Sequence, residues 1–486
     1  MKDVISIRDF SRADLDLLVQ NALELKQGNA DKSEKKRKVA SLFFEPSTRT
    51  RTSSEVAAEL DDHYVNGFAG TEGTSVKKGE PLADTVRMYE GYDFNAIVMR
   101  HTLEGAARLA SDYVKIPVIN GGDGPNGHPT QAMLDLMTIK EAKGKIDDLK
   151  VAFVGDLKYG RTVHSLLQAF EHYDVTPWLI APNNVSLPEW RVKEYEANTG
   201  KKVVISDNLL DAIRNVDVLY MTRIQRERFP QGKEGDDEYE KVSWIYKLNA
   251  EILKSAHPNL KVMHPLPRYK NNLEVALDVD ATSHALYFEQ ARNGMFMRQA
   301  ILRKVFGDGF EGKKKEAVDE KYAEELPIGT PRSKKENLYV FNNGTLIDHL
   351  ELGGGYKIKP LLRLMDYHDS PIIIGNNVPS AKYGQKDVYC LVDFFLTPEQ
   401  TWKLGLISDR ATINILKEGK VQRKFKVVLP SQLEGLIECQ NRNCISRPEH
   451  FEHAKSRFYV ESRQPLKLRC HYCEKPVGRE EMKVIY

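Results

Sequence analysis

Apolar residues in the first 306 positions alternate between short continuous runs and stretches with helical spacing. A first helix is predicted from Ser11, because Asp14 stands three residues later as a capping partner and leucines follow at helical spacing. Buried strands are predicted at 39–44, 96–99, 150–155, 177–181, 217–221 and 261–263. Strands and helices that alternate in this way predict two doubly wound parallel-sheet domains, with ligands beyond the carboxyl ends of the strands.

The pattern changes after residue 306. Residues 307–337 carry many charges, two prolines and little apolar periodicity, which predicts an interdomain linker. Strand-like and helical stretches alternate again over 338–430, as in an α+β, ferredoxin-like domain. The remaining segment, 431–486, carries four of the five cysteines and is expected to be a small β-rich domain. We place the first domain at 1–130, completed by a helix at 285–306, and the second at 131–284.

Composition excludes several classes of function. The chain has 486 residues, and its 71 Lys and Arg nearly balance 69 acidic residues. No global field therefore favours nucleic acid or an anionic membrane, and anions must bind at local sites. The N-terminus is charged from its second residue and lacks an apolar stretch, so we expect neither a signal peptide nor a membrane span, and a cytoplasmic location.

The segment Pro46 to Arg51 combines three hydroxyl side chains, fixed positive charge and backbone N–H groups where a strand gives way to a helix. This combination is suited to binding phosphate, through Ser47, Thr48, Arg49 and Thr50. An N-capping serine followed by a solvated basic turn is the alternative.

Further polar residues follow other predicted strands. Arg100 follows one strand, and His128 and Gln131 lie in a loop that opens a helix, so Arg100 and a neutral His128 are candidates to stabilise an oxyanion without a metal. Arg161 and Arg223 also follow strands, and two arginines suit a dicarboxylate. Separate surface ion pairs would explain each arginine singly. The loop around Gly155 and Gly160 lacks a dinucleotide-binding pattern.

The cysteines form two close pairs, Cys439 with Cys444 and Cys470 with Cys473. Four thiolates that leave no open position predict one structural zinc ion per chain. A non-catalytic zinc ribbon that binds nucleic acid is the alternative from another functional class.

Seven motifs in order, PSTRTR, SVKKGE, MRH, GHPTQ, GDLKYGRTVHSL, YMTRIQ and HPLPR, resemble those of aspartate carbamoyltransferases. GTLIDHL, ATIN, NCIS and CHYCEKP resemble the regulatory chain of the same family. The resemblance implies a natural fusion that transfers a carbamoyl group from carbamoyl phosphate to L-aspartate in pyrimidine biosynthesis, without a catalytic cofactor. An ornithine carbamoyltransferase-like enzyme is the nearest alternative, but HPLPR replaces the cysteine-containing turn usual there, and Arg161 and Arg223 would repel ornithine.

The resemblance also assigns residues. Carbamoyl phosphate would be bound by Ser47, Thr48, Arg49, Thr50, Arg100, His128, Gln131, Leu266 and Pro267, with Ser75 and Lys78 from a neighbouring subunit. Aspartate would be bound by Arg161, Arg223, Gln225 and Lys78. Thr50, Arg100, His128 and Lys78 would be catalytic, in a homo-oligomer built on trimers that share active sites. Lys77 is the alternative to Lys78; Glu45 would pair with Arg161, and Arg228 would fix a closing loop.

In the regulatory part, matching positions imply a site for ATP or CTP. Its residues would be Asp348, His349, Lys386, Asn414 and Lys424. Cys390 stands where a second lysine is expected, and the loss of that cation would weaken nucleotide binding or change which nucleotide is preferred.

Overall fold

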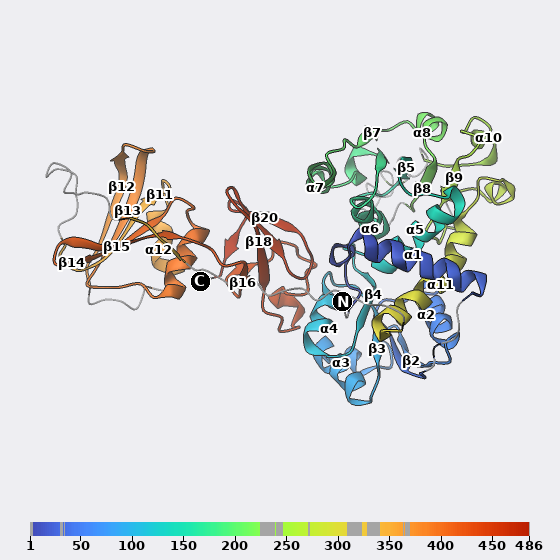
Figure 1. The fold of residues 1–486 in the computed structure, drawn as a ribbon, viewed down its shortest axis with the longest axis horizontal. Helices are drawn as coiled ribbons and strands as arrows, with labels where there is room; N and C mark the ends of the chain where they lie inside the picture. The colour runs from blue at the N-terminus through green and yellow to red at the C-terminus, as the bar shows by residue number, and fades with distance from the viewer. Residues whose placement is uncertain are drawn as a thin grey trace. The chain divides into compact units, whose positions relative to one another are not determined.

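The computed structural model describes residues 3–29, 33, 35–223, 239, 246–270, 273–308, 323–327, 341–362, 364 and 370–485. The chain forms two compact units, Met1–Lys314 and Lys315–Tyr486 (Figure 1). Within the described ranges, every helix is too short or too polar to cross a bilayer.

The first sheet of the N-terminal unit is parallel, with strand order β2-β1-β3-β4. Its strands are β1 (Lys38–Phe43), β2 (Tyr64–Ala69), β3 (Ala96–His101) and β4 (Val118–Asp123). The accompanying helices are α1 (Arg12–Gln27), α2 (Arg49–Glu59), α3 (Leu82–Gly91) and α4 (Ala106–Tyr113). The predicted cap of α1 is confirmed, since Ser11 and Asp14 form a capping box. Strands β2 and β4 were not predicted, because β2 is largely exposed and β4 contains two consecutive glycines, so neither is a continuous apolar run.

The second sheet is also parallel, with order β7-β6-β5-β8-β9. Its strands are β5 (Leu149–Val154), β6 (Val175–Ile180), β7 (Val204–Ser206), β8 (Val218–Met221) and β9 (Lys261–Met263). The helices around it are α6 (Arg161–Phe170), α7 (Glu189–Thr199), α8 (Leu209–Asn215) and α10 (Ala250–Leu253). The short edge strand β7 was not predicted.

Two further helices, α5 (Pro129–Lys143) and α11 (Tyr287–Phe306), lie with α1 between the two sheets (Figure 1). Residues 129–139 of α5 are all buried. One hydrophobic core joins Phe43 from the first sheet, Met137 and Met297 from these helices, and Phe153 from the second sheet. This shared core packs both sheets against the same pair of helices, so the ends of strands from both sheets face the same space.

The C-terminal unit contains a six-stranded antiparallel sheet of order β10-β15-β14-β11-β13-β12. Its strands are β10 (Ala323–Glu325), β11 (Gly344–Leu350), β12 (Ile372–Ser380), β13 (Gly384–Val392), β14 (Thr412–Lys417) and β15 (Lys420–Val427). Helix α12 (Gly355–Leu361) follows β11 and helix α13 (Pro398–Lys403) follows β13. The order β11-α12-β12-β13-α13-β14 confirms the ferredoxin-like prediction.

The segment predicted as a linker is not entirely a linker. Its residues 323–325 form β10, which pairs with β15 at the sheet edge. Periodicity cannot reveal a strand this short. Most of the remaining predicted linker lies outside the described residues.

The last part of the chain is β-rich, as predicted. One sheet has the order β16-β18-β19-β20 and a second pairs β17 with β21. The strands are β16 (Gln432–Glu434), β17 (Ile437–Glu438), β18 (Arg457–Arg463), β19 (Leu466–Cys470), β20 (Pro476–Gly478) and β21 (Lys483–Val484).

Candidate functional site

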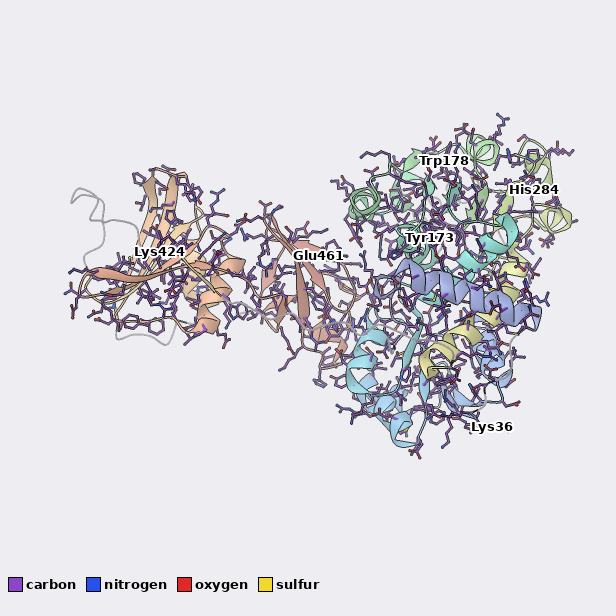
Figure 2. The ribbon with its side chains drawn as sticks, viewed as in Figure 1. Lys36, Tyr173, Trp178, His284, Lys424 and Glu461 are labelled. Carbon is purple, nitrogen blue, oxygen red and sulfur yellow. The ribbon has the colours of Figure 1, made fainter. Side chains whose placement is uncertain are left out.

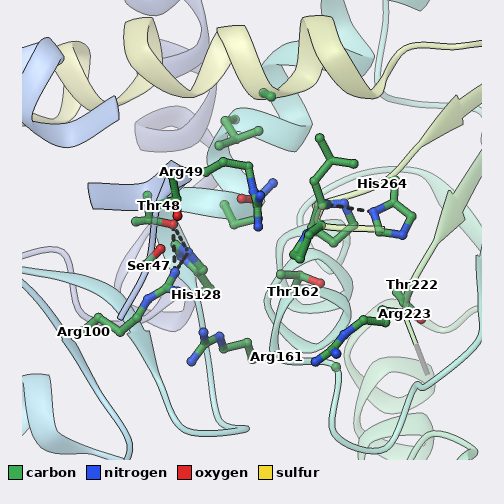
Figure 3. Close-up of a pocket in the computed structure, with 18 of the residues that line it drawn as sticks. Ser47, Thr48, Arg49, Arg100, His128, Arg161, Thr162, Thr222, Arg223 and His264 are labelled. Atoms are coloured by element: carbon green, nitrogen blue, oxygen red, sulfur yellow. Dashed lines mark hydrogen bonds between the residues drawn. The ribbon is translucent and has the colours of Figure 1, made fainter. Parts of the chain in front are cut away.

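A cavity of about 730 Å³ lies in the N-terminal unit, where residues from both parallel-sheet halves meet (Figure 3). Ser47, Thr48, Arg49, Arg100 and His128 gather on one side, and Arg223 and His264 lie on the other. Most residues predicted to bind substrate line this cavity. They are Ser47, Thr48, Arg49, Thr50, Arg100, His128, Gln131, Arg161, Arg223, Leu266 and Pro267.

Three helix N-termini contribute to the lining. Thr48 precedes α2, His128 precedes α5 and Gly160 precedes α6, and none of these three helices has a side-chain cap. Uncapped first-turn N–H groups and the positive end of the helix dipole favour an anion. Helix α1, whose N-terminus carries a capping box, does not line the cavity.

The charged side chains of the lining are mainly cations. Among the lining residues that the structure describes, five arginines, Arg49, Arg100, Arg161, Arg223 and Arg298, stand against two carboxylates, Glu45 and Asp156. Such a surplus of fixed cations in a concave site selects strongly anionic ligands. A phosphate together with a dicarboxylate matches this surplus.

Thr50, Arg100 and His128 form a group of mutually hydrogen-bonded side chains in the cavity. Arg100 Nη2 donates to Thr50 Oγ1 at 2.8 Å, and its Nε donates to the Gly121 carbonyl at 2.8 Å. His128 Nε2 lies 3.2 Å from Thr50 Oγ1 and 3.1 Å from Arg100 Nη2. Arg100 belongs to β3 itself, although the apolar pattern predicted that it would lie just after the strand. Three polar groups from β3, α2 and the start of α5 thus converge on one point.

His128 is a neutral imidazole. Burial, followed by the positive charges of Arg100, Arg161 and Arg298, lowers the pKa of His128 well below its ordinary value. Because the Arg100 guanidinium can only donate, Nε2 accepts from Arg100 in this structure and the ring proton lies on Nδ1, 3.3 Å from the Thr130 hydroxyl. When Arg100 instead donates to a ligand, the other tautomer, with the proton on Nε2, can donate to an oxygen that gains negative charge.

Arg161 is held at the junction of the two halves. Its Nη1 donates to Glu45 Oε2 and to the Gly124 carbonyl, each at 3.1 Å, so the expected pair with Glu45 is present. Gly122 makes room for it: a Cβ there would lie 3.0 Å from Arg161 Cζ, and its φ of +119° suits only glycine.

A turn after β9 forms the opposite wall. His264 Nδ1 accepts from the Leu266 N–H at 2.7 Å, and the His264 N–H donates to Gln290 Oε1 at 2.8 Å. These bonds hold Pro265, Leu266 and Pro267 against the cavity.

Some predicted residues are not in this cavity. Ser75 and Lys78 lie in the exposed turn Ser75–Lys78 and do not line the cavity of their own chain. Gln225 and Arg228 lie outside the described residues.

Other lining residues were missed. They include Ser53, Asp156, Tyr159, Thr162, Thr222, His264, Gln290 and Arg298. Arg298 and Gln290 belong to α11, far along the chain from the motifs. The one signal in the sequence is an arginine, Arg298, within a helix that packs in the core. Residue spacing alone does not show whether such an arginine is buried or exposed.

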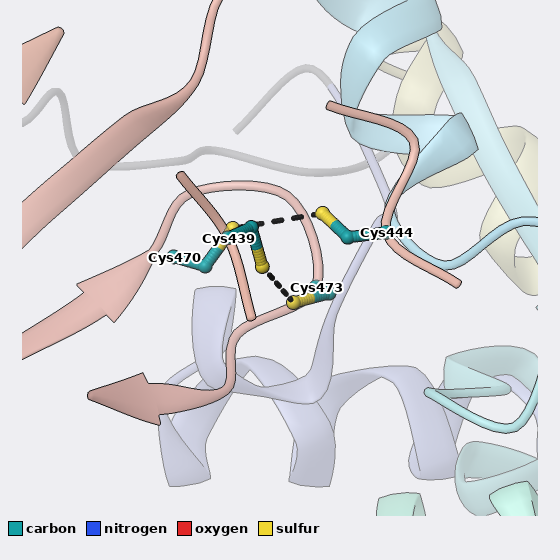
Figure 4. A group of neighbouring side chains, drawn as sticks. All are labelled: Cys439, Cys444, Cys470 and Cys473. Atoms are coloured by element: carbon teal, nitrogen blue, oxygen red, sulfur yellow. Dashed lines mark hydrogen bonds between the residues drawn. The ribbon is translucent and has the colours of Figure 1, made fainter. Parts of the chain in front are cut away.

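The four predicted metal ligands converge in the last domain (Figure 4). The sulfur atoms of Cys439, Cys444, Cys470 and Cys473 are all buried and lie within 4.8 Å of one another. The sulfur atoms of Cys439 and Cys473 are 3.6 Å apart, and those of Cys444 and Cys470 are 3.8 Å apart. A tetrahedral ion with metal–sulfur bonds of about 2.3 Å requires sulfur separations of about 3.8 Å, so these ligands fit one metal ion.

The predicted effector residues share one region of the six-stranded sheet, which Lys424 marks in Figure 2. Lys386 Nζ lies 2.8 Å from Asp348 Oδ1, and His349 Nδ1 lies 3.1 Å from the Thr412 hydroxyl. Asn414 pairs in register with Lys424 across β14 and β15. Burial lowers the pKa of His349, as do the charges of Lys386, Lys424 and Lys382, although Asp348 opposes them.

Cys390 is buried beside this region. Its thiol packs with Phe341 and Leu416, and burial followed by the charge of Asp348 raises its pKa to about 12. The thiol is therefore neutral, and it adds no positive charge to the sheet.

Four family models match successive parts of the chain. Residues 2–141 match the carbamoyl-P binding domain and residues 147–305 the Asp/Orn binding domain of aspartate/ornithine carbamoyltransferases. Residues 337–428 match the allosteric domain and residues 431–483 the metal binding domain of the aspartate carbamoyltransferase regulatory chain.

Curated relatives resemble the first part. The chain is 49% identical over 307 residues to the aspartate carbamoyltransferase catalytic subunit of Chromobacterium violaceum, covering 63% of this chain and 98% of the relative. It is 50% identical over 311 residues to that of Thermococcus kodakarensis, covering 63% and 97%.

Solved structures agree. The M. jannaschii aspartate transcarbamoylase catalytic subunit matches with a TM-score of 0.58 at 41% identity, over 64% of this chain and 99% of that one. The Trypanosoma cruzi aspartate transcarbamoylase, in complex with carbamoyl phosphate and aspartate, matches with a TM-score of 0.57 at 36% identity, over 62% and 95%. These matches favour neither an ornithine-specific enzyme nor a nucleic-acid zinc ribbon. The chain belongs to the aspartate carbamoyltransferase family and joins that family's catalytic and regulatory domains in one polypeptide.

Proposed function

We propose that the arginine-rich cavity is where this enzyme transfers the carbamoyl group from carbamoyl phosphate to the amine of L-aspartate. The products are N-carbamoyl-L-aspartate and phosphate, in an early committed step of pyrimidine biosynthesis. The observation that carries the assignment is the convergence of Thr50, Arg100 and His128 within 3.2 Å at the uncapped ends of α2 and α5.

Each side of the cavity has a proposed role. Ser47, Thr48 and Arg49 bind the phosphate at the start of α2, where backbone N–H groups add to the guanidinium charge. Gln131 contacts the carbamoyl end, and the turn with Leu266 and Pro267 closes over both substrates.

Aspartate binds on the opposite side of the cavity. Arg161 and Arg223 hold its two carboxylates, and we keep Gln225 in the proposal on the family resemblance alone. Bidentate guanidinium contacts fix the orientation of a carboxylate as well as its charge.

The chemistry needs positioning and charge stabilisation. The amine nitrogen attacks the carbamoyl carbon, and negative charge grows on the carbonyl oxygen. Thr50, Arg100 and a neutral His128 donate to that oxygen. The carbon–oxygen bond to phosphate then breaks, the phosphate leaves with the electron pair, and the proton lost by the amine can pass to it.

We also propose that the site is completed by Ser75 and Lys78 of a neighbouring subunit in a trimer. Lys77 forms an ion pair with Glu72 at 2.7 Å, whereas Lys78 has no ion pair with any residue that the structure describes. This difference favours Lys78 as the residue available to the neighbour. A hybrid of Lys78→Ala and Arg100→Ala chains tests it: sites that combine residues of two chains recover activity on mixing, and unshared sites do not.

For the C-terminal unit we propose nucleotide effector binding within 338–430 and one structural zinc ion in 431–486. The lysines around Asp348 and His349 suit the phosphates of ATP or CTP. The four buried thiolates suit Zn²⁺, which would stabilise the domain without entering the reaction. None of the five cysteines is in a disulfide, which supports the proposal of a reducing, cytoplasmic location.

The direct test is the initial rate of carbamoyl-aspartate formation against aspartate concentration, with ornithine as a parallel acceptor and with ATP or CTP added separately. Turnover with aspartate that either nucleotide alters supports the whole proposal. Turnover indifferent to nucleotides removes the effector part, and turnover with ornithine alone contradicts the acceptor assignment.

A further inference from the structure

A buried carboxylate, Asp135, lies one helical turn beyond Gln131 in α5 and is 0% exposed. Its Oδ1 accepts from Gln131 Nε2 at 2.9 Å and from Gln290 Nε2 at 2.7 Å. Its Oδ2 accepts from the Tyr220 hydroxyl at 2.8 Å. Asp135 does not line the cavity, so the mechanism above gives it no contact with substrate.

The two glutamines that donate to Asp135 connect it to both walls of the cavity. Gln131 and Gln290 line it from α5 and α11. Gln290 Oε1 in turn accepts from the His264 N–H at 2.8 Å, and His264 Nδ1 accepts from the Leu266 N–H at 2.7 Å. A continuous chain of hydrogen bonds therefore runs from the residue proposed to contact the carbamoyl group to the turn proposed to close over the substrates.

An ionised carboxylate can only accept hydrogen bonds, so it fixes the direction of both amides. The NH₂ group of Gln131 must face Asp135, which leaves its amide oxygen as the polar atom for a ligand. That oxygen can accept from the NH₂ group of a carbamoyl substrate. The NH₂ group of Gln290 is held in the same way, which points its oxygen at the His264 N–H.

We propose that Asp135 is a positioning residue that orients Gln131 and, through Gln290 and His264, the Leu266–Pro267 turn, and that its negative charge sets the strength of this alignment. The proposal rests on the proposed substrate contacts of Gln131 and of the turn.

The charge of Asp135 changes near neutral pH. Burial raises the pKa of Asp135 to about 7, against the hydrogen bonds from Gln290, Tyr220 and Gln131, which lower it. The ionisable groups that face it are Tyr220 from β8 and Arg298 from α11. Tyr220 stays protonated, because burial raises its pKa well above the ordinary value.

Protonation of Asp135 weakens the hydrogen bonds that orient Gln131 and Gln290 without removing them. Above the pKa all three bonds to Asp135 are charge-assisted, and below it Oδ1 accepts the two amides as a neutral carbonyl oxygen. Catalytic efficiency with carbamoyl phosphate should therefore rise as the pH rises through about 7.

The test is kcat/KM for carbamoyl phosphate between about pH 5.5 and about pH 8.5, for the full-length enzyme and for Asp135→Asn. The substituted amide keeps an acceptor oxygen and resembles the protonated form of the carboxyl group. We expect kcat/KM of the wild type to rise about tenfold as the pH increases through this range, because neutral hydrogen bonds become charge-assisted ones. We call this rise the pH step. For Asp135→Asn we expect kcat/KM to stay at the low level, with no pH step.

A matched control is Asp61→Asn. Asp61 is also buried and accepts from residues of α11, Gln299 Nε2 at 3.0 Å and Arg303 Nε at 2.9 Å, but neither of these partners lines the cavity. Its variant should lose stability and keep the step. Tyr220→Phe removes one donor to Asp135, so it should move the step to higher pH even if Asp135→Asn does not fold.

A step that persists in Asp135→Asn, or that Tyr220→Phe leaves in place, overturns the positioning role while turnover with aspartate stands. Absence of turnover in the wild type would instead contradict the proposed function. The two failures are therefore distinct.

Discussion

Replacement of His128 by alanine tests the proposed oxyanion site most directly. The side chain is 3% exposed, and its ring contacts only Thr50, Arg100 and Thr130 among the described hydrogen bonds. The bond from the His128 backbone N–H to Ser165 Oγ, 2.8 Å long, does not involve the ring and would survive. The substitution therefore removes one polar side chain from the cavity and leaves its frame intact.

The size of the effect follows from the geometry. Thr50 and Arg100 remain to stabilise the oxyanion, so His128→Ala should remove one donor of three. Loss of one such donor in a water-poor site typically lowers kcat by roughly 10²- to 10³-fold, or about 3 to 4 kcal/mol in activation free energy. KM for both substrates should change far less, because the bond to His128 strengthens only as charge develops on the oxygen.

The assay is steady-state formation of carbamoyl-aspartate, with kcat and KM measured for both substrates from about pH 6 to about pH 9. Because the pKa of His128 lies well below its ordinary value, the imidazole is neutral throughout, and the ratio of wild-type to variant kcat should not vary with pH. His63→Ala is the control: His63 is buried against the Phe306 ring, outside the cavity, and should affect stability alone. A loss confined to KM, or a ratio that changes tenfold with pH, would refute the reasoning.

Three other predictions follow from local contacts. Gly122→Ala should raise KM for aspartate at least about tenfold, because the new Cβ meets the Arg161 guanidinium and the backbone is strained; Gly28→Ala, at φ +74° with open space around it, should leave KM unchanged. A zinc chelator, or Cys473→Ser, should release one zinc ion per chain, measured by metal analysis, and unfold the last domain while carbamoyl-aspartate formation continues; lost activity in an intact trimer would contradict this. Lys386→Ala should weaken ATP or CTP binding about tenfold, measured by titration calorimetry, by removing a cation from the effector region, and an unchanged affinity would place the phosphates elsewhere.

Local sequence patterns were sufficient to single out the cavity residues Ser47 to Thr50 and the four clustered cysteines. Ser47 to Thr50 are consecutive and sit at a strand-to-helix junction that hydrophobic periodicity reveals. The cysteines form two short pairs, so only one distance, between the pairs, depended on the fold. Where the chemistry is built from neighbours along the chain, the sequence alone predicts it.

Other features could not be predicted from the sequence, because their apolar pattern is weak or absent. Strand β2 is largely exposed, β4 contains two consecutive glycines, and β10 has three residues inside a charged segment, so none shows a continuous apolar run. Gly122 looks like any loop glycine until the Arg161 guanidinium is seen 3.0 Å from its missing Cβ.

The family, the two parallel-sheet halves and the reactive groups on them could all be read from the sequence, because these depend on short motifs and local periodicity. The tertiary structure was needed to show that α11 returns from residue 287 to place Gln290 and Arg298 in the cavity, and that Asp135 joins Gln131 to the far wall. Hydrogen bonds between residues 155 positions apart leave no periodic trace in the sequence, since any buried face of a helix shows the same pattern whichever partner it meets.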